Sequence, residues 1–123
     1  MAGPPEGVVR EPREALSLGY ELLAGGRPFA AHEVFEDAWK TRPAEEDGFW
    51  RGLAQLAVGV THAARGNRVG AVRLLRRGAA NLAAYPSLHG VDGAAVRAWC
   101  ADAVAAVERE VPVTLPPPPL PAQ

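Results

Sequence analysis

Apolar side chains recur three and four positions apart along most of this chain, with charged residues between them. That spacing places apolar residues on one face of a helix, whereas a half-buried strand would alternate at every second position. The pattern therefore predicts five helices, at about residues 13–24, 28–41, 45–65, 68–85 and 93–109. Because the links between them are short, we expect an all-α, up-and-down bundle of about five helices, with no strand and no internal repeat.

Glycine, proline and acidic residues mark the predicted helix boundaries. Gly25 and Gly26 end the first helix, because glycine accepts the left-handed conformation that closes a helix. Pro28 suits the first turn of the second helix, where its missing N–H is not needed. The acidic run 45–47 complements the positive end of the third helix, and Asp92 can cap the fifth.

The third predicted helix is apolar on nearly every side. Phe49 and Leu53 begin its main apolar row, and the opposite side is hardly more polar. A helix of this kind belongs at the centre of a bundle. Gly52, Gly59 and Gly66 recur every seven residues, although glycine in a helix interior costs roughly 1 kcal/mol against alanine. We therefore expect another helix or a ligand to approach closely along this row of glycines.

The length of 123 residues is that of one domain. We place this domain at about residues 13–109, between an N-terminal segment rich in Pro and Gly (1–12) and a Pro-rich tail (110–123). We expect the N-terminal segment to be flexible and the tail to be disordered and extended, since closely spaced prolines fit neither a helix nor a central strand.

Composition narrows the range of partners. The net charge of −1 argues against binding to nucleic acid or anionic lipid, so Arg73, Arg76 and Arg77 are interpreted as a solvated helix face. The longest run of low charge, 52–64, is too short to cross a membrane, and the N-terminus lacks the pattern of a signal peptide. A single cysteine, Cys100, excludes an internal disulfide, and we expect a cytoplasmic protein.

A histidine and a carboxylate lie in the middle of the second predicted helix. His32 and Glu36 are four residues apart, so their side chains are stacked on one side of the helix. Phe29, Phe35 and Trp39 share the same sector of roughly 120°, which we expect to face the core. Since burying a lone carboxylate costs several kcal/mol, Glu36 would have to find a partner or take up a proton there.

Several motifs follow one another in a recognisable order along the chain. They are 29–39 with His32, Glu33, Glu36 and Trp39; 49–58 with Gly52 and Gln55; His62; Arg65-Gly66-Asn67; Gly70-Ala71; Tyr85-Pro86; and Gly90-Val91-Asp92. Together these motifs resemble those of domain of unknown function family 309 (DUF309), over about residues 13–109. The resemblance implies a small all-helical protein of bacterial or archaeal origin, and it implies no established activity.

One hypothesis for the polar residues is a metal site. His32 and Glu36 can hold one metal ion, with Glu33 nearby as the general base. His62, on the third predicted helix, would complete a set of two histidines and one carboxylate with open positions for water. The chain would then be a metal-dependent, hydrolase-like enzyme with a divalent metal as its cofactor.

A second hypothesis is a buried polar cluster that fixes the register of the second and third helices. Its members would be His32, Glu36, Arg51, Gln55 and His62, beside Trp39. A third is a pocket for a small-molecule ligand or a proton transfer without metal. The polar cluster requires no ligand or metal, because buried polar groups must pair with one another in any case. We therefore favour a binding or structural module, which can also form a homo-oligomer.

Two further residues have predicted environments. His89 lies in a loop rich in Gly and Pro, where we expect it to be exposed. Cys100 falls on the inner face of the fifth predicted helix, where a buried and unreactive thiol is expected.

Overall fold

The computed structural model of the protein describes residues 7–112. These residues form α1 (Pro12–Ala24), α2 (Pro28–Thr41), the 3-10 turn η1 (Ala44–Glu46), α3 (Asp47–Ala64), α4 (Arg68–Leu82), the strands β1 (Ser87–Leu88) and β2 (Val91–Asp92), and α5 (Gly93–Glu108). The predicted all-α fold with five helices is confirmed, with every boundary within about three residues of its predicted place. The expectations for residues 1–6 and 113–123 lie outside the described residues.

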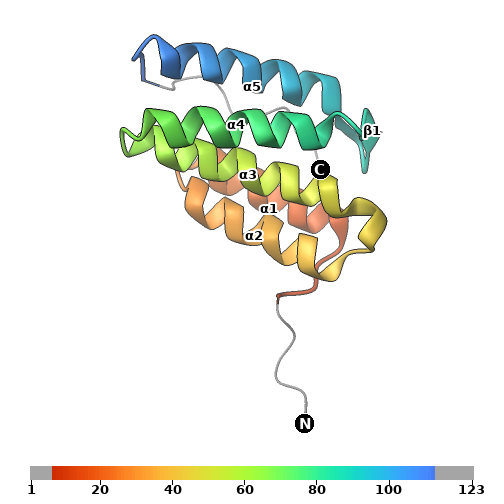
Figure 1. Cartoon of the computed structure of the whole chain (residues 1–123). Helices are drawn as coiled ribbons and strands as arrows, with labels where there is room; N and C mark the ends of the chain where they lie inside the picture. The colour runs from red at the N-terminus through yellow and green to blue at the C-terminus, as the bar shows by residue number, and fades with distance from the viewer. Residues whose placement is uncertain (1–6, 113–123) are drawn as a thin grey trace.

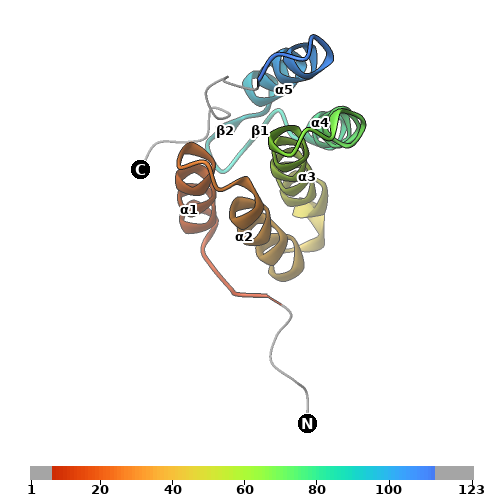
Figure 2. The same cartoon turned by 90° about the vertical axis from the view of Figure 1, so that its left-hand side faces the viewer.

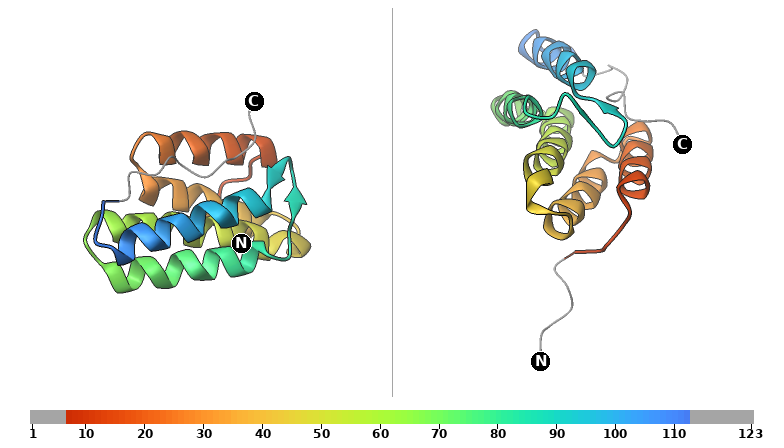
Figure 3. Two further views of the ribbon diagram at one scale, coloured as in Figure 1. Left: turned by 90° about the horizontal axis from the view of Figure 1, so that it is seen from above. Right: turned by 90° about the vertical axis from the view of Figure 1, so that its right-hand side faces the viewer.

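Each helix packs on its neighbour in the sequence, so the helices form a curved row from α1 to α5 (Figure 1). Figure 2 shows this row nearly end-on, with α1 and α2 on one side and α5 beyond α4 on the other. Successive helices run in opposite directions, as expected for short connections. The β-hairpin closes the end of the row where α4 leads into α5 (Figure 3). Within residues 7–112, no helix has both the length and the apolar character needed to cross a bilayer.

The core is centred on α3, as its apolar sequence predicts. Phe49, Trp50 and Leu56 are fully buried on this helix. The predicted inner face of α5 is buried along its whole length, at Val96, Trp99, Cys100, Ala103, Val104 and Val107. Burial raises the pKa of the Cys100 thiol to about 12, so the thiol stays protonated and unreactive at neutral pH.

Glycines let α3 and α4 approach each other closely. A Cβ atom on Gly78 would lie 2.8 Å from the carbonyl oxygen of Gly52, and one on Gly52 would lie 3.0 Å from that of Gly78. Gly59 makes room in the same way for Leu75, whose Cγ would lie 2.8 Å from an added Cβ. The expected close approach is therefore confirmed, and the approaching element is α4. Gly66, the third glycine of the series, instead ends α3 with a φ of +78°.

The hairpin was not expected from the sequence. Ser87 pairs with Asp92 and Leu88 with Val91, and the two residues between the strands both have positive φ, 52° at His89 and 82° at Gly90. Two positive φ values define the tight turn that suits the twist of paired strands. Strands of two residues are too short for an alternating pattern to be visible in the sequence.

Of the sector of α2 that was predicted to face the core, only Phe35 is buried. Its buried residues are Ala31, Val34, Phe35 and Ala38. The ring of Phe35 contacts Gly19 of α1, which has no side chain to block it. Because α2 lies between α1 and α3, the side that faces both neighbours is buried, and His32, Glu36 and Trp39 lie toward the edge of the core.

Candidate functional site

His32 and Glu36 lie at the edge of the core and not inside it. The side chain of His32 is 17% exposed and that of Glu36 is 39% exposed, so the prediction that both are buried is wrong for Glu36. His32 Nδ1 donates a hydrogen bond to the carbonyl oxygen of Phe29 at 2.9 Å, and its Nε2 lies 3.6 Å from Glu36 Oε2. Glu36 also lies 3.4 Å from the ammonium group of Lys40. The negative charge of Glu36 is therefore compensated by solvent and by Lys40.

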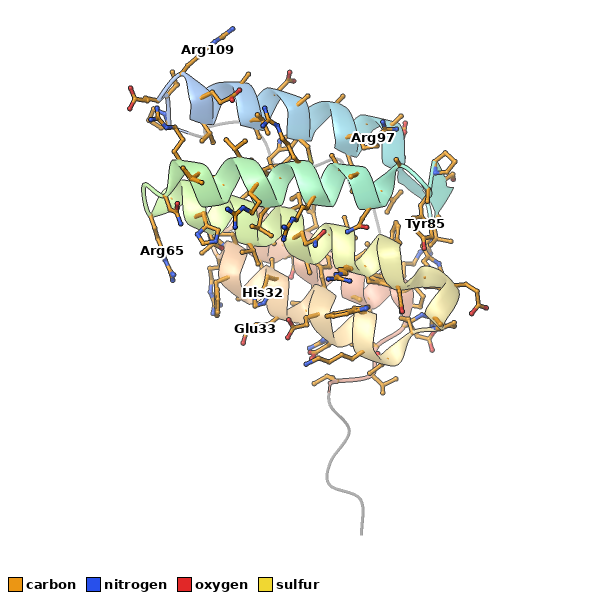
Figure 4. All side chains as sticks on the ribbon, viewed as in Figure 1. His32, Glu33, Arg65, Tyr85, Arg97 and Arg109 are labelled. Atoms are coloured by element: carbon orange, nitrogen blue, oxygen red, sulfur yellow. The ribbon has the colours of Figure 1, made fainter. Side chains whose placement is uncertain are left out.

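Arg51 of α3 and Arg65, which directly follows α3, lie over aromatic rings of α2. The guanidinium carbon of Arg51 lies 5.3 Å from the ring centre of Trp39, and that of Arg65 lies 5.9 Å from the ring centre of Phe29. Both distances fit cation–π contacts. These contacts join the two helices near both of their ends, with His32 between them along α2. Figure 4 shows His32 on the side of α2 toward α3, and Arg65 near the end of α3.

Gln55 and His62, the other α3 residues of the predicted cluster, are paired on the α4 side. Asn81 donates a hydrogen bond to Gln55 Oε1 at 2.6 Å. Asn67 Oδ1 accepts from the backbone N–H of Gly70, so its Nδ2 faces His62 and donates to His62 Nδ1 at 3.1 Å. The predicted cluster is thus divided into separate pairs, which attach α3 to both of its neighbours.

The predicted metal ligands are not brought together. Among residues 7–112, no group of three or more His, Cys, Asp or Glu side chains is arranged to hold a metal ion. His32 and Glu36 are neighbours, but His62 Nδ1 already accepts from Asn67, which leaves the proton of neutral His62 on the other ring nitrogen. Glu33, the predicted general base, is exposed on α2.

A fully engaged carboxylate, Glu46, lies at the start of α3. Its Oε1 accepts hydrogen bonds from Trp50 Nε1 at 2.9 Å and from His89 Nε2 at 2.9 Å, and Arg42 Nη2 lies 3.1 Å from Oε2. The side chain of Glu46 is only 14% exposed. Burial by itself raises the pKa of this carboxyl group, but the hydrogen bonds from Arg42, His89 and Trp50 and the charge of His89 outweigh it. Together they lower the pKa to about 2.

This Glu46 cluster (Arg42, Glu46, Trp50 and His89) is a partly buried polar network made of residues other than those of the predicted cluster. The expectation that His89 is exposed is wrong, since its side chain is 23% exposed and its ring lies beside that of Trp50. The acidic run 45–47, followed by Trp50 one turn later, was the available sequence signal. The contact with His89 spans 43 residues, and no local pattern indicates it.

Two hollows of the surface lie away from all the predicted site residues. One, of about 830 Å³, lies where the ends of α3, α4 and α5 meet, around Val60, Val69 and Val107. The other, of about 650 Å³, lies between α4 and α5 around Val72 and Arg73. His32, Glu36 and their neighbours therefore form an open face, whereas small-molecule sites are usually enclosed.

The comparison with known proteins agrees with the resemblance seen in the sequence. The model of the family described as "Domain of unknown function (DUF309)" matches residues 16–74, from α1 into α4, and this range contains every predicted site residue. The resemblance is thus confirmed over this range, while residues 75–109 lie beyond it. "Uncharacterized protein YpuF" of Bacillus subtilis (strain 168) is 39% identical over 65 residues, which are 52% of this chain and 37% of that protein. The match therefore covers little more than a third of the length of that relative. No solved structure matches this chain.

Proposed function

We propose that this chain is a protein-interaction module that binds its partner through one open face of α2 and α3. The face consists of Phe29, His32 and Trp39 on α2, Arg51 on α3 and Arg65 directly after α3, and we call it the arginine–aromatic face. The observation that carries this proposal is the pair of cation–π contacts, in which both guanidinium groups lie on rings that are themselves partly exposed.

The exposure of these side chains supports the proposal. Phe29 is 50% exposed, Trp39 is half-buried, and both arginines are exposed. Aromatic residues and arginine are the types most enriched in protein–protein interfaces, where they account for much of the binding energy. A phenylalanine left half in water gains from being covered, because each Å² of apolar surface removed from water stabilises the complex by roughly 25 cal/mol.

The rigidity of the supporting helices also supports the proposal. Helix α3 is fixed to α4 by the glycine contacts, and Phe35 holds α2 against α1. The exposed ring of Phe29 is oriented by His32, which donates a hydrogen bond to the carbonyl group of Phe29 and whose ring packs against that of Phe29 at an angle of 46°, with centres 4.8 Å apart. A surface that is ordered before binding loses less conformational entropy when the partner arrives.

The test is crosslinking from defined positions in cells that contain the natural partner. A photo-crosslinking amino acid replaces Phe29 in one variant and Arg97 of α5 in the other, which is exposed on a different helix (Figure 4). We expect one discrete protein adduct from position 29 and none from position 97. Trp39→Ala in the position-29 variant should remove the adduct, because it removes the surface on which Arg51 lies.

Two results would contradict the proposal. One is the absence of any adduct from position 29 when the variant is folded, as judged by its circular dichroism. The other is an identical adduct from position 97, which would indicate nonspecific capture.

A further inference from the structure

Arg51 and Arg65 have aromatic partners but no acidic ones. Among residues 7–112, no carboxylate lies within ion-pair distance of either guanidinium group. Other arginines also lack a carboxylate partner, but Arg51 and Arg65 are oriented by aromatic rings. A guanidinium group stacked on a ring keeps its N–H donors in the plane of the group, where they can bind a carboxylate with two parallel hydrogen bonds. The arginine–aromatic face therefore presents two unfilled sites for carboxylates.

The two arginines are attached at a defined separation. Arg51 lies on α3, and Arg65 directly follows the last residue of this helix, 14 positions further along the chain. At 1.5 Å per residue this corresponds to roughly 21 Å along α3. At 100° per residue the two positions differ by roughly 40° around the helix axis, so both lie on the side of α3 that faces α2.

The region between the two arginines has a different charge. Glu36 occupies the middle of α2 and is 39% exposed, with His32 and Lys40 beside it. A further carboxylate placed over this region would be repelled by Glu36. A complementary partner is thus acidic at two points and not acidic between them.

The backbone chemistry of α2 and α3 favours a helical partner. An extended segment needs hydrogen bonds for its backbone N–H and C=O groups, which it usually obtains from the edge of a sheet. Helices α2 and α3 offer no such edge, because their backbone groups are bonded within each helix. A helix satisfies its own backbone, and it repeats the rise and rotation of α3 when it lies alongside.

The same features argue against a nucleic acid as the partner. One strand of a nucleic acid carries a phosphate about every 3.4 Å of duplex axis, so it would also place negative charge over the region between Arg51 and Arg65. The exposed Glu33 and Glu36 would also repel a continuous polyanion.

Given the proposed function, we infer that the arginine–aromatic face binds a helix of a partner protein that carries two carboxylates 14 residues apart. One carboxylate pairs with Arg51 and the other with Arg65. The uncharged stretch between them covers Phe29, His32 and Trp39. Both ion pairs are aligned by the aromatic rings beneath them.

The test measures binding of synthetic helical peptides to the full chain at low salt. One peptide of 18 residues carries Glu at positions 2 and 16, with Ala, Leu and Gln elsewhere and a hydrocarbon staple on its opposite side. The first control peptide carries the two Glu residues seven positions apart, and the second has Gln in place of both. We expect the first peptide to bind roughly tenfold more tightly than the first control, which can form only one of the two ion pairs, and roughly a hundredfold more tightly than the second, which can form neither.

Variants of the protein identify the surface that binds. Arg51→Ala and Arg65→Ala should each weaken binding of the first peptide roughly tenfold, while Arg97→Ala should leave it unchanged. Arg51→Glu should abolish binding, and replacing the matching Glu of the peptide by Lys should restore it. Rescue of this kind requires direct contact between the two side chains.

Three results would overturn the inference. Equal binding of all three peptides would show that two carboxylates 14 residues apart are not required. Loss of binding in Arg97→Ala to the same degree as in Arg51→Ala would remove the assignment to this face. Binding of a single-stranded oligonucleotide that depends on Arg51 and Arg65, with no binding of the first peptide, would assign the face to phosphates. If the peptides fail while crosslinking from position 29 still depends on Trp39, the proposed function stands and only the acidic helix is excluded.

Discussion

His89 Nε2 lies 2.9 Å from Glu46 Oε1, and this contact joins the turn of the β-hairpin to the first residues of α3. The two residues are 43 positions apart in the chain. Arg42 and Trp50 bind the same Glu46 carboxylate, whose side chain is only 14% exposed. The donors of the Glu46 cluster therefore all point at one carboxylate group. The hairpin is thereby connected to the centre of the row of helices and does not depend only on its own two pairs of residues.

Ionisation of Glu46 should make stability depend on pH in a defined acid range. The pKa of this carboxyl group falls from an ordinary value of 4.5 to about 2 in the folded protein. The ionised form therefore stabilises the fold fully above about pH 4.5, and this contribution is lost as the pH falls toward about 2. Urea unfolding of the wild type and Glu46→Gln between pH 7 and pH 2 should show a difference in unfolding free energy that narrows across that range.

The exposed Glu33, which forms no ion pair within residues 7–112, provides the matched control for this measurement. Glu33→Gln should change stability little at any of these pH values. A difference between wild type and Glu46→Gln that stays constant from pH 7 to pH 2 would contradict the role assigned to the carboxylate.

Replacement of His89 by Asn should separate the hydrogen bond from the turn. Asn tolerates the left-handed φ of 52° found at this position, so the turn is kept while the donor to Glu46 is lost. We expect His89→Asn to lower the unfolding free energy by about 1.5–3 kcal/mol, as for a hydrogen bond to a charged group. The fluorescence of Trp50 should shift, because its ring lies beside that of His89. Unchanged stability and unchanged fluorescence would indicate that the hairpin is held by other contacts.

Gly78→Ala should destabilise the protein, opposite to the usual effect of this change in a helix. In an exposed helix interior, replacing Gly by Ala stabilises by roughly 1 kcal/mol. Here the added Cβ would lie 2.8 Å from the Gly52 carbonyl oxygen, so α3 and α4 would have to separate. We expect a net loss of about 1–3 kcal/mol, as for other overpacked cores. A higher melting temperature for Gly78→Ala than for the wild type would show that the two helices are not in close contact there.

Phe29 and Phe35 on α2 should respond in opposite ways to the same replacement. Phe35 is fully buried against Gly19, so Phe35→Ala should cost about 3–5 kcal/mol of stability. Phe29 is half exposed, so Phe29→Ala should cost less than about 1 kcal/mol and act mainly on partner binding. Urea denaturation of both variants measures the first effect, and binding of the helical peptide with Glu at positions 2 and 16 to the Phe29→Ala variant measures the second. Equal losses of stability in the two variants would contradict the orientation of α2.

The sequence was sufficient for the parts of this protein that depend on local periodicity. Apolar spacing located all five helices, and Gly25, Pro28 and Asp92 lie at the expected helix boundaries. The glycine row of α3 indicated a close neighbour, because isolated glycines in a helix interior are unfavourable unless something approaches them. The same local reasoning placed His32 beside Glu36. The order of the motifs along the chain indicated the resemblance to DUF309, whose family model matches residues 16–74.

Tertiary structure alone decided which side of each helix is buried and which polar groups meet. The side of α2 that faces the core depends on α1 and α3 together, and the space left by Gly19 for Phe35 turns Glu36 toward solvent. The contact between Glu46 and His89 depends on how the chain passes from α4 into the hairpin. Because the two residues are 43 positions apart, no local sequence pattern predicts this contact. Helix formation is a property of neighbouring residues, whereas burial and polar contacts depend on which elements pack together in three dimensions.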